Sequence, residues 1–138
     1  MEKSRQRIIY EQRIFCVQDY ITDNLDLELS TEKLARLAAF SPFHFHRIFK
    51  AIAGETLYDF IQRVRLEKSC IFLSLNHNMK ITNIALDCGF STPSAFSKAF
   101  KQYYGISPSD YRKKIPVMAI LKKLKAGMEH IMAVLKKK

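Results

Sequence analysis

The sequence predicts an all-α protein in which a long linker helix joins two helix-turn-helix subdomains and an amphipathic helix follows at the C-terminus. Three observations support this fold class. Apolar residues recur at helical spacing through most of the chain, a segment of about fifty residues occurs twice, and prolines and glycines stand at the ends of the repeated segments. We therefore expect no sheet.

The length and the charge limit what the protein can be. A chain of 138 residues suits one compact domain or two small lobes that share a core. The formal net charge of +10 and the pI near 9.7 make a polyanion the default partner. No apolar run reaches the roughly 20 residues that span a bilayer, and the N-terminus lacks the apolar core of a signal peptide, so we expect a cytoplasmic protein with no membrane partner.

The cysteines and histidines predict neither a metal site nor an enzyme. Cys16, Cys70 and Cys88 are far apart in the sequence and lie in apolar helical patterns, so buried free thiols are expected. His44 and His46 are two residues apart and lie on different faces of a helix, where they cannot hold one zinc ion together. No serine, cysteine or carboxylate stands at a catalytic spacing from a histidine. We therefore expect no cofactor and no catalytic residue.

The first helix is predicted over about residues 7–24. Apolar residues keep helical spacing there, at Ile14, Val17, Tyr20 and Ile21. The polar residues Thr22, Asp23 and Asn24 end the pattern. We expect this helix to pack across the first of the two repeated units.

The first helix-turn-helix unit is predicted at about residues 29–53. Ser30 is a good N-cap for its supporting helix. Ser41 caps its second helix, and Pro42 occupies the first helical position, where a missing N–H costs nothing. Ala39 lies in the tight turn between the two helices, at a cost of about 1 kcal/mol if its φ is positive. This arrangement is typical of proteins that present a second helix to the major groove of DNA.

The second helix of this unit has two separate faces. Its apolar residues form one stripe that should face a core: Phe45, Ile48, Phe49 and Ile52. An aromatic ring, an imidazole and two cations share another side, which we call the first outward face: Phe43, His46, Arg47 and Lys50. Such a combination is unusual for a surface that only has to be soluble.

A linker helix over about residues 56–75 is predicted to connect this unit to the second one, at about residues 80–104. The mostly inward positions of the linker helix are Leu57, Phe60, Ile61, Val64, Leu66, Ile71 and Leu73. The second unit repeats the first at an offset of 50 to 51 residues, with Gly89 in its turn and Thr92-Pro93 as its cap and first helical residue. A short helix over 108–113 follows.

The second helix of the second unit has the same two faces. Its apolar stripe consists of Phe96, Ala99, Phe100 and Tyr103. We call its other side the second outward face: Ser94, Ser97, Lys98 and Lys101. A basic face on one helix alone is usually just solvated, but its duplication at matched positions favours a function.

Residues 114–138 form a basic amphipathic tail helix. Its apolar residues keep helical spacing from Val117 to Leu135, and lysines occupy its other side. We expect this helix to cover apolar surface on the domain or to begin a region that is not otherwise present. Dimerisation and association with a membrane surface are the alternatives.

Four motifs in order resemble the AraC/XylS family of bacterial transcription activators: AFSPFHFHRIFK, RVRLEKS, IALDCGFSTPSAFSKAFK and GISPSDYR. The resemblance implies that residues 1–113 are a bilobed, all-α DNA-binding domain. It implies that both recognition helices enter successive major-groove segments of bent double-stranded promoter DNA. It also implies a chain that binds DNA as a monomer and recruits RNA polymerase.

The resemblance assigns roles that agree closely with the outward faces. Its base-contacting positions fall on Phe43, His46, Arg47, Pro93, Ser94, Ser97 and Lys98. Phosphate contacts suit the capping hydroxyls and the outer lysines: Ser41, Lys50, Thr92 and Lys101. Among these residues Arg47 is best suited to bidentate contact with guanine O6 and N7, and Phe43 to a thymine methyl group. Since Ser94 and Ser97 are small, the second helix should contribute more through phosphate and DNA shape.

Two other functions fit the same sequence. A DNA binder with this fold can act as a repressor or an architectural protein that bends DNA. A protein of another class, a non-catalytic interaction protein, could use the tail helix to bind a partner. Binding to a specific promoter fragment against excess random duplex separates the DNA binder from the interaction protein.

Overall fold

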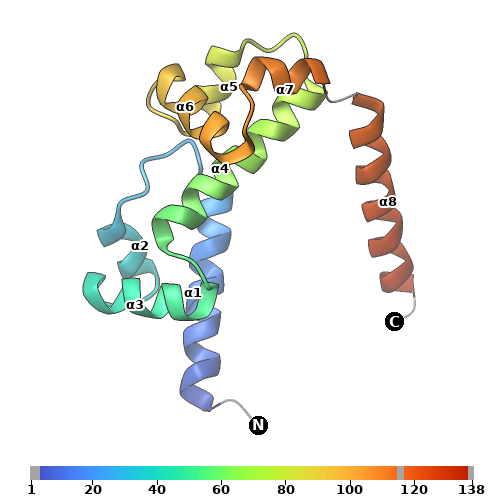
Figure 1. Ribbon diagram of the computed structural model, residues 1–138. Coiled ribbons are helices and arrows are strands. Elements are labelled where there is room, and N and C mark those ends of the chain that lie inside the picture. The colour runs from blue at the N-terminus through green and yellow to red at the C-terminus, as the bar shows by residue number, and fades with distance from the viewer. Residues whose placement is uncertain (1–3, 115–116, 137–138) are drawn as a thin grey trace. The chain divides into compact units, whose positions relative to one another are not determined.

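The structure is a computed structural model that describes residues 4–114 and 117–136, and this part of the chain contains helices and no strand (Figure 1). The all-α prediction is confirmed, as are seven helices before the tail. The helices are α1 (Arg5–Asp23), α2 (Thr31–Leu37), α3 (Pro42–Ala53), α4 (Leu57–Leu75), α5 (Ile81–Asp87), α6 (Pro93–Tyr104), α7 (Pro108–Lys114) and α8 (Val117–Lys136).

The chain divides into two compact units. The first consists of Met1–Glu67 together with Asp87–Phe90, and the second of Lys68–Leu86 together with Ser91–Lys138. The linker helix α4 therefore begins in the first unit and ends in the second.

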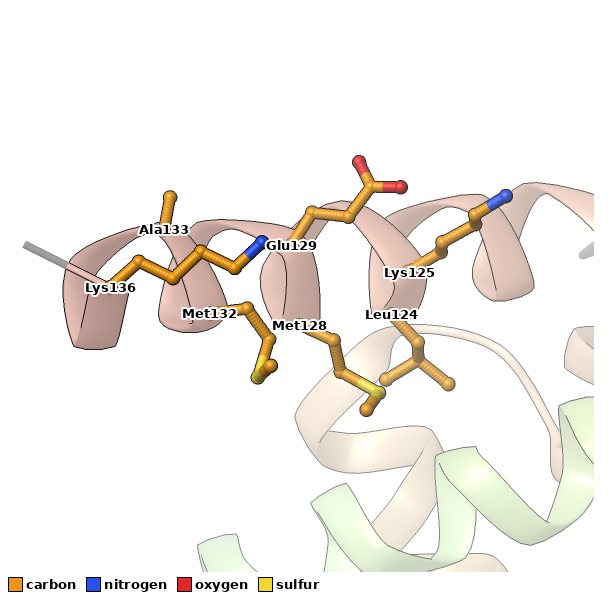
Figure 2. A pocket seen from close by; sticks show the side chains of 7 residues that line it. All are labelled: Leu124, Lys125, Met128, Glu129, Met132, Ala133 and Lys136. Atoms are coloured by element: carbon orange, nitrogen blue, oxygen red, sulfur yellow. The ribbon is translucent and has the colours of Figure 1, made fainter.

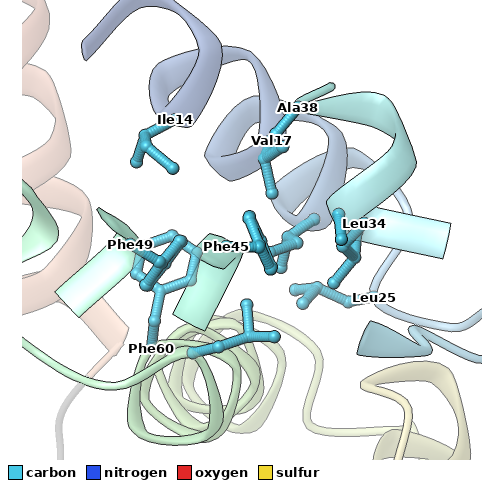
Figure 3. Packing of buried hydrophobic residues seen from close by; sticks show 11 residues of the cluster. Ile14, Val17, Leu25, Leu34, Ala38, Phe45, Phe49 and Phe60 are labelled. Atoms are coloured by element: carbon cyan, nitrogen blue, oxygen red, sulfur yellow. The ribbon is translucent and has the colours of Figure 1, made fainter. Parts of the chain in front are cut away.

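The first unit has its own hydrophobic core, built by α1, α2, α3 and the start of α4 (Figure 3). Phe45 and Phe49 of α3 are fully buried. The ring of Phe49 meets the ring edges of Phe45 at 5.8 Å and of Phe60 at 5.6 Å, a geometry that aromatic quadrupoles favour. Helix α1 contributes Ile14, Val17 and Ile21, which confirms that it packs across this unit.

The second unit also buries two phenylalanines of its second helix, but the packing differs at the C-terminal end of α6. Phe96 and Phe100 of α6 are fully buried. The ring of Phe100 lies 4.7 Å from that of Tyr104 and 5.4 Å from that of Tyr111 on α7. Tyr103, which we placed in the apolar stripe, is 53% exposed. The prediction for Tyr103 was wrong because the neighbouring Tyr104 takes the inner place, where its ring packs against those of Phe100 and Tyr111.

Two other burial predictions were wrong. Ile71 of α4 is exposed, although we placed it among the inward residues of that helix. None of the three cysteines forms a disulfide, but Cys16 is exposed and Cys70 only half-buried, so Cys88 alone is buried. Cys16 is exposed because it precedes Val17 by one residue, and one residue turns a helix by about 100° away from the buried stripe.

Both helix-turn-helix turns contain a residue with positive φ. Ala39 has a φ of 60° and Gly89 a φ of 96°. The left-handed conformation at Ala39 carries the strain anticipated from the sequence. The φ at Gly89 explains why a glycine suits this position in the second turn.

The tail is helical as predicted, but the described part of its apolar side is not covered. Exposure ranges from 45% to 66% at the described large apolar residues of α8: Leu124, Met128, Ile131, Met132 and Leu135. The expectation that this side is buried against the domain is therefore wrong for these residues. Among the described residues, no helix is long and apolar enough to cross a membrane.

Candidate nucleic-acid interface

Helices α3 and α6 are built alike at both ends. Each has 12 residues. The Ser41 hydroxyl accepts a hydrogen bond from the His44 N–H at 3.3 Å, and the Thr92 hydroxyl accepts one from the Ala95 N–H at 3.0 Å. These bonds satisfy one free N–H in each first turn and leave others directed outward from the helix N-terminus.

The C-terminal ends of α3 and α6 also match. Gly54 and Gly105 both adopt the left-handed conformation, with φ of 80° and 81°. Their N–H groups donate to the carbonyl oxygens of Lys50 at 3.0 Å and Lys101 at 2.8 Å. The internal repeat seen in the sequence is therefore a repeat in structure at α3 and α6, including the caps at both of their ends.

Burial separates the two faces of α3. Phe45 and Phe49 are inaccessible to solvent, whereas all four residues of the first outward face are exposed. Phe43 is 76% exposed, the largest value among the exposed large hydrophobic side chains of the described residues. A phenyl ring left open beside Arg47 and His46 is available for apolar contact with a ligand.

The second outward face on α6 is smaller. Ser94, Lys98 and Lys101 are exposed, as is Pro93 before them. Ser97 is only half-buried rather than exposed, and its side chain is short. This face therefore offers two long cations and little else that can reach a partner.

Neither helix holds a carboxylate that could neutralise these cations. The sequences of α3 and α6 contain no aspartate or glutamate. None of the ion pairs between described residues involves Arg47, Lys50, Lys98 or Lys101. The cations combine with the positive ends of the two helix dipoles to attract anions.

Arg63 on α4 differs from the cations of α3 and α6, because two carboxylates of the protein pair with it. Its guanidinium pairs with Glu55 at 2.6 Å and with Glu67 at 3.0 Å. Hydrogen bonds to these carboxylates, first to Glu55, raise the pKa of Arg63 above its usual value. Its charge is thus committed within the protein, and it holds the loop before α4 to that helix.

A cluster that the sequence analysis did not single out holds α1 against the start of α3. The ring of Tyr10 meets that of Phe40 at 5.0 Å, and Phe40 meets His44 at 5.3 Å. The Arg13 guanidinium lies 5.3 Å from the centre of the Phe40 ring. The only sequence signal was the spacing of Tyr10 and Arg13 on one helix, because Phe40 is far from them in the sequence. His44 thus packs toward α1 and is not part of the first outward face.

The described residues contain no group of three or more histidine, cysteine or acidic side chains able to hold a metal ion. All eleven predicted contact residues lie on α3 and α6 or at their N-caps. Each of the two capped helices therefore carries charge that attracts an anion, and α3 also offers an aromatic ring, an imidazole and a guanidinium.

Comparisons with known proteins agree with this arrangement. A family model described as a helix-turn-helix domain matches residues 34–114. The transcriptional activator AarP of Providencia stuartii is 36% identical over 93 residues, which are 67% of this chain and 68% of AarP.

Two solved structures, one of them a DNA-binding domain, have the same fold. The C-terminal domain of AraT, a response regulator from Geobacillus stearothermophilus, is 28% identical, with a TM-score of 0.70 over 75% of this chain and 86% of that domain. The DNA-binding domain of AdpA, solved in complex with a target DNA, is 25% identical, with a TM-score of 0.68 over 72% of this chain and 89% of that domain. Some curated relatives are longer, and the match spans only 35% to 46% of their length.

Proposed function

The chain belongs to the AraC-type helix-turn-helix family of transcriptional regulators, and we propose that it recognises specific promoter sequences by inserting α3 and α6 into successive major-groove segments of double-stranded DNA. The observation that carries this proposal is the duplicated, acid-free outward face on two helices capped in the same way. A solvated surface has no reason to repeat at matched positions. The activity is binding, and it requires no cofactor or catalytic group.

The residues of the first outward face have distinct roles in this proposal. The planar fork of Arg47 suits guanine O6 and N7, and the exposed ring of Phe43 suits a thymine methyl group. His46 donates to or accepts from a base edge between them. Lys50 and the Ser41 hydroxyl contact phosphates at the edges of the groove.

The second outward face has a smaller share in base recognition. Lys98 contacts a base edge, with Pro93, Ser94 and Ser97 close to the groove floor, while Lys101 and the Thr92 hydroxyl contact phosphate. Because Ser97 is half-buried and Ser94 is short, this helix acts mainly through phosphate contacts and DNA shape.

Transcription activation is the regulatory outcome we favour. Activators occur among the relatives, and AarP is one by name. One chain occupies one DNA site, since it carries both recognition helices. It acts at the nucleoid, where it recruits RNA polymerase to the promoter. A repressor or an architectural DNA binder is the second candidate, because the same two faces would serve it equally well.

The experiment that tests the proposal begins by selecting tight-binding duplexes from a random pool with the full chain. The selected duplex should bind at least about a thousandfold more tightly than a scrambled one at physiological salt. A footprint should cover roughly 20 base pairs without a palindrome, because two recognition helices one turn of B-DNA apart are separated by about 34 Å. Equal affinity for both duplexes would show that the basic faces bind DNA without reading it.

In vitro transcription then separates the regulatory outcomes. The selected site is placed upstream of a weak promoter, and transcript is measured with RNA polymerase in the presence and absence of the chain. An increase supports activation, whereas a decrease that follows site occupancy identifies a repressor.

A further inference from the structure

The exposed apolar side of α8 has the spacing of a helix that pairs with another helix. From Val117 to Leu135 the apolar positions are separated alternately by four and three residues, and we call these six positions the seam: Val117, Leu121, Leu124, Met128, Ile131 and Leu135. An average separation of 3.5 residues is the heptad spacing of coiled coils, in which the seam corresponds to positions a and d.

The described seam residues are open to a partner. Leu124, Met128, Ile131 and Leu135 are 45% to 66% exposed, and Met132 beside them is 53% exposed. Figure 2 shows Leu124, Met128 and Met132 on one side of α8, and the hollow along this helix is lined by α8 residues alone. A helix with so much open apolar surface is marginal in water without a cover.

The positions of the charged residues on α8 indicate which kind of partner packs against the seam. The six positions that flank the seam are Met118, Ile120, Lys125, Gly127, Met132 and Val134, so only one of them is charged. Lys122 and Lys123 occupy positions further from the seam, whereas Glu129 and Lys136 line the same hollow as Met128 and Met132. An acidic partner helix would need cations beside the seam, whereas a second copy of α8 meets apolar flanks and keeps its lysines apart.

We propose that α8 is a self-association helix through which two copies of this chain pair in solution. The pairing gives one particle two DNA-binding domains, each of which can occupy its own site. It favours dimerisation, one of the alternatives for the tail helix, over a chain that binds DNA as a monomer. The proposal does not rest on the DNA contacts, because the seam lies outside α3 and α6.

The test is sedimentation of the full chain without DNA over about 1 to 100 μM, where a dimer must respond to concentration. The mass should rise from the 16.1 kDa of one chain toward twice that value. Met128→Glu places a carboxylate in the seam and should weaken pairing about 100-fold or more. Ala126→Glu, which adds the same charge on the exposed far side of α8, should leave pairing intact.

A control keeps the result interpretable. Affinity for a short duplex should be the same in both variants as in the unaltered chain, which shows that the DNA-binding domain is folded. A chain that stays at 16.1 kDa over the whole range overturns the proposal, as does equal pairing by the two variants. Binding of the monomeric chain to phosphatidylcholine vesicles doped with phosphatidylglycerol, lost in Met128→Glu, would instead make the seam a membrane-surface face.

Discussion

Ala39 and Gly89 occupy equivalent places in the two turns, yet their surroundings differ. Ala39 already accommodates a Cβ at a φ of 60°. At Gly89 a Cβ would overlap the carbonyl oxygen of Leu25 and approach Arg65 Nε to 2.7 Å. Arg65 cannot move away freely, because it is itself partly buried, and this burial lowers the pKa of its guanidinium. The glycine in the second turn is thus required by space as well as by φ.

Gly89→Ala should therefore destabilise the protein by more than about 3 kcal/mol, the sum of left-handed strain and overlap with backbone. The matched control is Gly105→Ala, which has a φ of 81° but no atom within 4 Å of the added Cβ. That variant should lose only about 1 kcal/mol. Urea denaturation of both variants measures the difference. Equal losses would show that φ alone determines the preference for glycine in this turn.

At the scale of elements, the N-cap residues of α3 and α6 stabilise these helices and also lie at the helix ends that attract anions. The hydroxyls of Ser41 and Thr92 satisfy N–H groups in the first turns, at the helix ends where the dipole attracts an anion. In our proposal the same hydroxyls lie beside DNA phosphates. Stability and DNA affinity should therefore respond differently to different replacements of one residue.

Ser41→Ala should cost about 1 kcal/mol of stability through loss of the cap. Ser41→Asp should keep the stability, because aspartate caps as well as serine. It should nevertheless weaken binding to all duplexes, since a carboxylate repels phosphate, and the loss should shrink as salt rises. Thermal unfolding and duplex titrations measure the two effects. Undiminished DNA affinity in Ser41→Asp would place Ser41 away from the phosphates.

The helices before the tail were predictable to within one or two residues because their signals are local. Ser41, Pro42 and Gly54 mark the ends of α3, and the predicted boundaries agree with the structure. The burial of single residues was less predictable where neighbours compete. Tyr103 and Tyr104 both suit the inner side of the last turn of α6, and the choice depends on Tyr111 of α7, which periodicity within α6 does not reveal.

Contacts between segments far apart in the chain could not be predicted from the sequence either. The cluster of Tyr10, Phe40 and His44 depends on how α1 crosses α3. The exposed seam of α8 was recognisable as an apolar stripe, but the stripe did not say whether the domain covers it. The exposure of the first outward face was predictable because helical geometry places its residues away from the buried phenylalanines.

At the scale of the whole molecule, two copies of one unit have diverged in what their outward faces can do. The first offers Phe43, His46 and Arg47, all exposed, whereas the second offers mainly Lys98 and Lys101. We expect specificity to come chiefly from the first unit and salt-dependent affinity from both.

The measurement that tests this claim most directly compares Arg47→Ala and Lys101→Ala on the selected and the scrambled duplex at several salt concentrations. Arg47→Ala should cost about 1–3 kcal/mol on the selected duplex and relax the preference at one base pair. Lys101→Ala should weaken both duplexes alike and reduce the salt slope by about one unit, with Lys98→Ala between them. If Arg47→Ala weakens both duplexes equally, Arg47 contacts phosphate and α3 is not the principal reader of the sequence.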